Sequence, residues 1–520
     1  MRNVSVSSLP QWLCRAAIAS ALALPGLLGP VAASAQAADL AEGTTPTAAK
    51  SPFGHHLHIS AVDRVVVDQA SPVEVRPIEA GDADRQEQDT VWDQRLRLGA
   101  EWRWMQPTGF VRIAEAHLQA DLRTLSYNQL RLGEKGFLLR RAWAEVTTLA
   151  GQFAVGRTMS TWGLGLIAQA GDDDPMQFGV RRGGNIVHRA QYAILPGALF
   201  HKGDPFKAFP LALAIAYDDV VTDDLVQYNG DEAQQVVAAA LYRGKELQAG
   251  AYGVWREQKD RNGLRLDVTI VDAFAAYGRK FGDVGIKLAA EGVYIFGTTT
   301  WLRSANTPNG SDVAQVGGLA RAEVSAKNVT VRLDAGYASG DSRPLDDTLR
   351  NFRMAADYRA GLVLFQQVQR RHGLTAEQRL SDPRYSANPP EGVERVRTDG
   401  AVTQALFLHP VVRAQATEHL ALLFGAVYAE APADVADPFQ SYLAGGTPTG
   451  PRGAKNKRSL GTEFDAGIEL RLPLWGKEIQ LLSRVDAGVW LPGDAFDDAN
   501  GKPASAVGAV QGQLAVEIAL

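Results

Sequence analysis

Polar and apolar residues alternate along nearly the whole chain in segments of about 10 to 15 residues, and this pattern restricts the fold more than any other feature. In the segment 93–104 the odd positions are mostly charged and the even positions mostly apolar, and the segment 463–472 repeats the arrangement. Because side chains along a strand point alternately to its two faces, each segment predicts a strand with one charged face and one apolar face. The chain carries about a dozen such segments, whereas chance would give roughly two.

Alternation alone does not tell which face meets water. A soluble β-sandwich buries its apolar faces, whereas a transmembrane barrel turns them toward lipid and keeps polar groups inside. The segments are longer than the roughly 5 or 6 residues typical of globular strands. Aromatic residues lie at their ends, including Trp102, Trp104, Tyr294 and Trp490, where the membrane interfaces would be. The sequence therefore predicts an all-β fold, a closed antiparallel transmembrane β-barrel.

Short and long connections alternate between the predicted strands. Short ones, such as 280–283, predict periplasmic turns, and long ones, such as 160–184, predict external loops. Since strand direction must alternate, a first strand is required near 58–68, and residues 340–400 form one long external excursion with a short helix near 358–371. The count is about 18 strands, within a range of 16–18.

The first 35 residues predict a secretory signal peptide. Arg2 and Arg15 precede an uncharged, largely apolar stretch, and the small residues Ala-Ser-Ala end it with a suitable cleavage site. We expect residues 1–35 to be removed, residues 36–54 to form an N-terminal periplasmic segment, and residues 55–520 to form a single barrel. No later apolar run approaches the roughly 20 residues that a membrane-spanning helix needs.

Short motifs carry a resemblance to known barrels. The segment 156–165, which contains Thr-Trp-Gly-Leu-Gly, is similar to the strand-to-loop segment of alginate-export-like and related porin-type barrels. The segments 338–341 and 357–365, with Phe352 between them, and the segment 399–403 resemble a group of outer-membrane barrels abundant in myxobacteria, whose function is not established. The resemblance implies a porin-type barrel in the bacterial outer membrane, and it implies no substrate.

The polar faces of the clearest strands predict the residues that line a pore. Cations and anions nearly balance on these faces, which argues against a conduit for a polyanion, because such a conduit should be net basic. Two interpretations remain: cross-strand ion pairs that hold the wall together, or a weakly selective lumen. The predicted pore-lining residues are Arg95, Arg97, Glu101, Arg103, Glu115, His117, Asp121, Arg123, Arg321, Glu323, Arg332, Asp334, Glu463, Asp465, Glu469, Arg471, Arg484 and Asp486.

We predict an outer-membrane channel of the porin kind for passive or weakly selective diffusion of small hydrophilic solutes. The alternative is a non-conducting structural or surface-receptor barrel that residues 340–400 plug or cap. A barrel-embedded hydrolase is a third hypothesis, because Glu115, His117 and Asp121 share one strand face. No G-x-S-x-G motif accompanies them, so we expect no enzyme.

The expected partners follow from the predicted location. They are outer-membrane lipid and lipopolysaccharide, small hydrophilic solutes, and the barrel assembly machinery, since the last strand, 510–520, resembles the assembly signal of outer-membrane barrels. A homo-oligomer is left open. The net charge of -5 gives no basic patch for nucleic acid. We expect no cofactor and no metal; acidic loop clusters such as 172–174 are interpreted as solvated loop surface, with divalent-cation binding left open.

Overall fold

The computed structural model describes residues 54–520 apart from 80–81, 88–89, 107–108, 126–135, 182, 198–209, 229, 302–306, 344–345, 386–391 and 477. The predicted signal peptide, residues 1–35, lies outside the described residues. So does the predicted N-terminal segment, residues 36–54, except for Gly54, which begins the first strand.

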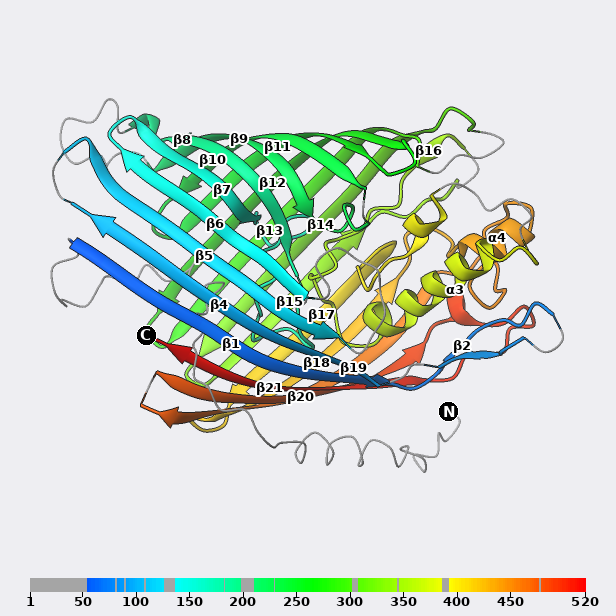
Figure 1. The fold of residues 1–520 in the computed structure, drawn as a ribbon. Helices are drawn as coiled ribbons and strands as arrows, with labels where there is room; N and C mark the ends of the chain where they lie inside the picture. The colour runs from blue at the N-terminus through cyan, green and yellow to red at the C-terminus, as the bar shows by residue number, and fades with distance from the viewer. Residues whose placement is uncertain are drawn as a thin grey trace.

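The long strands form one closed antiparallel barrel (Figure 1). They are β1 Gly54–Ala70, β4 Val91–Met105, β5 Val111–Leu125, β6 Gly136–Thr148, β7 Gly151–Ser160, β8 Asn185–Ile194, β9 Leu211–Thr222, β10 Glu232–Arg243, β11 Leu247–Lys259, β12 Arg265–Phe281, β13 Val284–Thr299, β14 Ser311–Ala326, β15 Val329–Ala338, β17 Ala405–Gln415, β18 Leu420–Glu430, β19 Ser459–Trp475, β20 Ile479–Pro492 and β21 Val507–Ala519.

The ring contains 18 strands, as the sequence predicts. The main sheet has 19 strands, but the two-residue strand β16 (Thr348–Leu349) pairs only with the beginning of β14 and stands outside the ring. β1 closes the barrel by pairing with β21 on one side and β4 on the other. The first strand, expected near 58–68, is therefore real and extends over 17 residues.

The two faces of the strands differ as the alternation predicts. In β5, Leu118 and Leu122 are exposed on the outer face, whereas Asp121 and Arg123 are buried on the inner face. Exposed large apolar side chains recur around the ring, among them Val271, Leu288, Val331, Phe424 and Ile468. This outer apolar surface is typical of a barrel wall in contact with lipid.

The two ends of the barrel carry different connections. At one end most are short, as at 282–283 between β12 and β13, and at 327–328 between β14 and β15. At the other end lie the longer connections and the smaller elements (Figure 1). We call these the turn end and the loop end. The smaller elements are β2 Val73–Glu74, β3 Arg85–Gln86, π-helix η2 Leu364–Gln369, α3 Arg370–Leu380, the 3₁₀ helices η3 Val393–Val396 and η4 Asp494–Phe496, and α4 Pro438–Leu443.

Two connections from the loop end fold into the barrel. The first insert, residues 161–184, joins β7 to β8, and the second insert, residues 339–404, joins β15 to β17. Phe178 of the first and Tyr358 and Phe365 of the second belong to one fully buried core with strand residues. The barrel therefore contains a hydrophobic core inside its lumen.

This arrangement corrects two predictions. The excursion 340–400 is not wholly external, because the stretch around Tyr358 and Phe365 packs against inward-facing side chains of the wall. The short helix does not lie at 358–371: η2 and α3 run without a break from Leu364 to Leu380. No helix in the described part of the chain is long and apolar enough to cross a membrane.

Candidate functional site

The predicted pore-lining residues all lie on barrel strands, and most are enclosed rather than exposed to an open channel. The buried ones are Arg95, Arg97, Asp121, Arg123, Arg332, Asp334, Glu463, Asp465, Glu469, Arg484 and Asp486. The more accessible ones are Glu101, Arg103, Glu115, His117, Arg321, Glu323 and Arg471. Whether any of them lines a conducting path stays a prediction.

Opposite charges face each other directly on the wall formed by β14 and β15. Arg321 is in register with Asp334, and Glu323 with Arg332. The Arg321 guanidinium donates through Nε and Nη2 to the two Asp334 oxygens, both at 2.7 Å. Arg332 Nε donates to Glu323 at 3.0 Å. The cross-strand pairs expected from the balanced charges are thus present here.

The wall formed by β1, β4 and β5 is arranged differently. Arg64, Arg95 and Arg123 are directly opposite one another across the three strands. Arg64 meets Asp173 of the first insert at 2.8 Å, and Arg123 meets Asp93 at 2.8 Å. Like charges directly opposite destabilise a sheet unless counterions are supplied. The arginines of this row therefore depend for their stability on acids that are not directly opposite them in the sheet.

His117 of β5 lies between two carboxylates. Its Nδ1 is 3.6 Å from Glu101 and its Nε2 is 3.4 Å from Glu115, and its ring packs on Trp143. Asp121, the third member of the suspected hydrolase group, is instead bound by Arg97 at 2.7 Å. The described contacts of His117 contain no hydroxyl nucleophile, so the geometry gives no support to a hydrolase.

Acidic residues of the first insert bind the wall from inside. Asp173 contacts Arg64, and Asp174 contacts Arg332 at 2.7 Å. Burial disfavours the charged Asp174 carboxylate, yet Arg332 and Arg181 keep its pKa below the usual value. The cluster 172–174 therefore does not lie on the external surface as expected, because wall arginines draw it inward, although the Asp173 side chain stays half exposed.

Two wall carboxylates hold the inserts through backbone N–H groups. Glu463 of β19 accepts from the amides of Leu362, Val363 and Leu364 at 2.5, 2.6 and 2.7 Å. Glu291 of β13 accepts from the amide of Leu164 in the first insert. Each acid therefore satisfies donors that the non-helical chain would otherwise leave unpaired in a dry interior.

A glycine makes the close approach to Glu291 feasible. Gly163 has φ +54°, in the left-handed region, and a Cβ on it would lie 2.5 Å from the Glu291 carboxylate. Only glycine meets both conditions without strain. The motif 156–165, singled out in the sequence, thus includes the turn that anchors the first insert.

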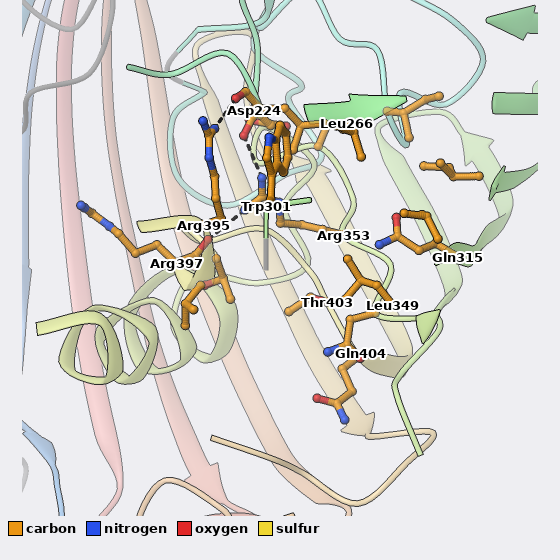
Figure 2. A pocket seen from close by; sticks show the side chains of 18 of the residues that line it. Asp224, Leu266, Trp301, Gln315, Leu349, Arg353, Arg395, Arg397, Thr403 and Gln404 are labelled. Carbon is orange, nitrogen blue, oxygen red and sulfur yellow. Dashed lines mark hydrogen bonds between the residues drawn. The ribbon is translucent and has the colours of Figure 1, made fainter. Parts of the chain in front are cut away.

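A cavity of about 420 Å³ lies between strands β10–β14 and the second insert (Figure 2). Leu266, Ile270 and Ile295 contribute apolar side chains to its lining. Arg395 lies over the Trp301 ring, 4.5 Å from its centroid, and its Nη2 is 2.9 Å from Asp231. The cavity is therefore mostly apolar, and this cation already has a carboxylate partner.

Arg353 and Asp224 connect the cavity lining to the loops around it. Arg353 donates to the carbonyl oxygens of Arg397 and Asp224, at 2.8 and 2.7 Å. The Asp224 carboxylate accepts from the amide of Ala356 at 2.8 Å. Burial raises the pKa of Asp224 to about 6.

The described part of the chain holds no group of three acidic, His or Cys side chains placed to bind a metal.

Among solved structures, the barrel is similar to OccK2 (OpdF) of Pseudomonas aeruginosa, crystallised in complex with glucuronate. The TM-score is 0.51 at 11% identity, and the match covers 90% of this chain and 98% of that one. The fold is that of porin-type outer-membrane barrels. OpdK of the same organism, crystallised with vanillate, gives 0.49 at 12% identity, with 89% and 98% covered. No protein-family model matches this chain, and no curated protein matches it by sequence.

Sequence reasoning missed Arg140, which is fully buried and donates to the carbonyl oxygens of Gly183 and Ala170. A bulge pairs Gln119 with Arg141 but Ala120 with Leu139, leaving Arg140 as the extra residue. A bulge interrupts the alternation of inward and outward residues, so the periodicity could not identify Arg140. The only sign of it in the sequence is that two arginines, Arg140 and Arg141, are adjacent.

Proposed function

We propose that this chain is a channel of the bacterial outer membrane for small solutes, with a lumen narrowed by the two inserts. The observation that carries the proposal is a closed 18-strand barrel whose outer face is apolar and whose inner face carries the charged side chains. The likeness of its fold to OccK2, whose crystals contain glucuronate, supports the same class of protein.

The inserts favour a restricted path over a wide water-filled pore. The first insert contacts Arg64 of β1, Arg332 of β15 and Asp486 of β20, so it extends across the lumen. The cavity beside the second insert is of a size for one compact solute. We infer passage of small molecules one at a time, with ion pairs on the wall limiting net charge selectivity.

Single-channel recording in planar bilayers tests the proposal with the full chain. We expect small, steady openings and a reversal potential near zero in a salt gradient. A folded barrel that never conducts would overturn the channel in favour of the plugged receptor barrel, for which the buried core inside the lumen is the specific observation. Strong anion selectivity would contradict the balanced wall.

A variant of one anchor sharpens this test. Glu463→Ala removes the acceptor of three buried amides, so the second insert should leave the wall and conductance should rise several-fold. Glu463→Gln is the matched control, because it keeps one carbonyl acceptor of the same length. Equal conductance of Glu463→Ala and the unaltered chain would show that the second insert does not restrict the path.

The remaining expectations belong to this proposal. The outer apolar surface would contact lipid and lipopolysaccharide, and the barrel assembly machinery would insert the chain. The similarity to alginate-export-like barrels and to the myxobacterial group stays part of the proposal, as does a homo-oligomer. His117, held between two carboxylates, would act in the wall and not in catalysis.

A further inference from the structure

Arg95 is a buried guanidinium with no carboxylate within 4 Å among the described residues. It is 3% exposed, and its Nε and Nη1 atoms have no hydrogen-bond partner. It is directly opposite Arg64 on one neighbouring strand and Arg123 on the other. Arg64 Nε, on the side of the row next to the first insert, also lacks a hydrogen-bond partner.

The acids around this row are already engaged by other arginines. Asp173 binds Arg64, Asp93 binds Arg123, and Asp121 binds Arg97 and lies 3.6 Å from Arg140. Asp172 is 3.8 Å from Arg97. Every arginine of the group except Arg95 therefore has an acid within 4 Å.

An arginine in this position cannot remove its charge by losing a proton, because the guanidinium stays protonated in proteins. A buried lysine can become neutral, but a buried arginine needs a negative charge beside it. Among the described residues Asp121 and Asp173 act on Arg95 only from beyond 4 Å, so the space beside its unpartnered nitrogens is open to a bound anion.

We propose that Arg95 binds a small inorganic anion of halide size, held between β1 and β4 beneath the first insert. The unpartnered Nε and Nη1 do not share one edge of the guanidinium, so a planar carboxylate cannot bind both at once. A monatomic anion needs no such planar fit and can accept from nitrogens of two side chains. This anion would be a resident part of the wall, and its presence does not depend on conduction.

Bromide is the probe, since it replaces chloride and scatters anomalously. Crystals of the full chain grown in sodium bromide should show an anomalous peak within hydrogen-bond distance of Arg95. The absence of a peak there, at a bromide concentration that labels other sites, would overturn the proposal.

Unfolding by urea in zwitterionic micelles provides the second measurement. At constant ionic strength, the midpoint should rise as sodium gluconate is replaced by sodium chloride. In Arg95→Gln the midpoint should no longer rise with chloride. Arg321→Gln removes an arginine that is paired with Asp334 on the wall of β14 and β15, and its midpoint should still rise with chloride. A chloride response that persists in Arg95→Gln would contradict the site. A response to acetate but not to chloride or bromide would show that carboxylates and not halides bind.

Discussion

Two parts of the same barrel wall solve the problem of buried charge in different ways. On β14 and β15 the strand register places Arg321 opposite Asp334 and Arg332 opposite Glu323. On β1, β4 and β5 the register places three arginines in a row, and Arg64 obtains its counterion from Asp173 of the first insert. The first wall pairs these charges within the sheet, whereas the second takes the partner of Arg64 from a loop that folds against it.

The difference teaches that the first insert is part of the wall. Arg321 and Asp334 are 13 residues apart in the sequence, whereas Arg64 and Asp173 are 109 apart. Asp174 of the same insert also reaches Arg332 on the β14–β15 wall, so the insert links both regions. Removal of a charge from β14 or β15 should therefore lower the stability of the wall itself. Removal of a charge from the Arg64–Asp173 pair should instead weaken the contact between the first insert and the wall.

The largest effect is expected from Asp334→Ala on the paired wall. The substitution leaves the largely enclosed Arg321 without its partner and removes the acceptor of the Tyr358 hydroxyl, which is 3.0 Å away. We expect a loss of about 3–5 kcal/mol in the free energy of unfolding, measured with urea in detergent micelles. Ser325→Ala, which affects a Ser325–Thr330 contact of the same strands, is the control and should change little. A loss below about 1 kcal/mol would show that this pairing adds little beyond register.

A smaller effect is expected from Asp173→Asn beside the wall of β1, β4 and β5. The Asp173 side chain is 51% exposed, so its pair with Arg64 is screened by solvent and should contribute about 1 kcal/mol. The change should appear mainly as faster protease cleavage within residues 161–184, because the insert loses a contact with β1. Asp347→Asn, in another loop, is the control. Unchanged cleavage would mean that the backbone contacts to Glu291 and Asp486 hold the insert alone.

The same substitution at two arginines compares the walls directly. In chloride-free buffer, Arg95→Gln removes a buried charge that no acid among the described residues contacts, so the free energy of unfolding should not fall and should rise by up to about 1 kcal/mol. Arg321→Gln breaks a buried pair and should cost roughly 3 kcal/mol. Equal losses in the two variants would indicate that Arg95 has a counterion in the protein itself.

The most local effect concerns a buried acid outside both walls. Asp437 begins α4 and accepts from the amide of Gln440 at 2.8 Å, and burial raises its pKa to about 7. The folded state therefore favours the protonated acid. Its stabilising contribution is complete below about pH 4 and is lost as the pH rises through 7.

Hydrogen-exchange protection in α4 measures this effect. We expect protection of the α4 amides to be about tenfold lower at pH 8 than at pH 6, after correction for intrinsic exchange. Asp437→Asn, which retains a good N-terminal capping side chain, should remove the difference. A pH dependence that survives in this variant would assign the titration to another group.

The alternation and the turn pattern were sufficient to predict about 18 strands and their charged inner faces, because both are local properties of the chain. They were not sufficient for Arg140, since a bulge interrupts the period of two there. The helix position also differed, because Glu463, a residue about a hundred positions away, fixes where the backbone turns into η2.

The sequence by itself determined a closed barrel with a charged interior and an apolar exterior, because each strand shows its two faces in its own residues. Only the tertiary structure decided that 161–184 and 339–404 enter the lumen and which acid meets which arginine. Contacts such as Asp174 with Arg332, 158 residues apart, depend on closure of the ring and on the relative positions of distant strands. The local alternation of residues does not show which distant side chains come into contact. Only the closed barrel therefore shows that the Nε and Nη1 atoms of Arg95 have no partner among the described residues.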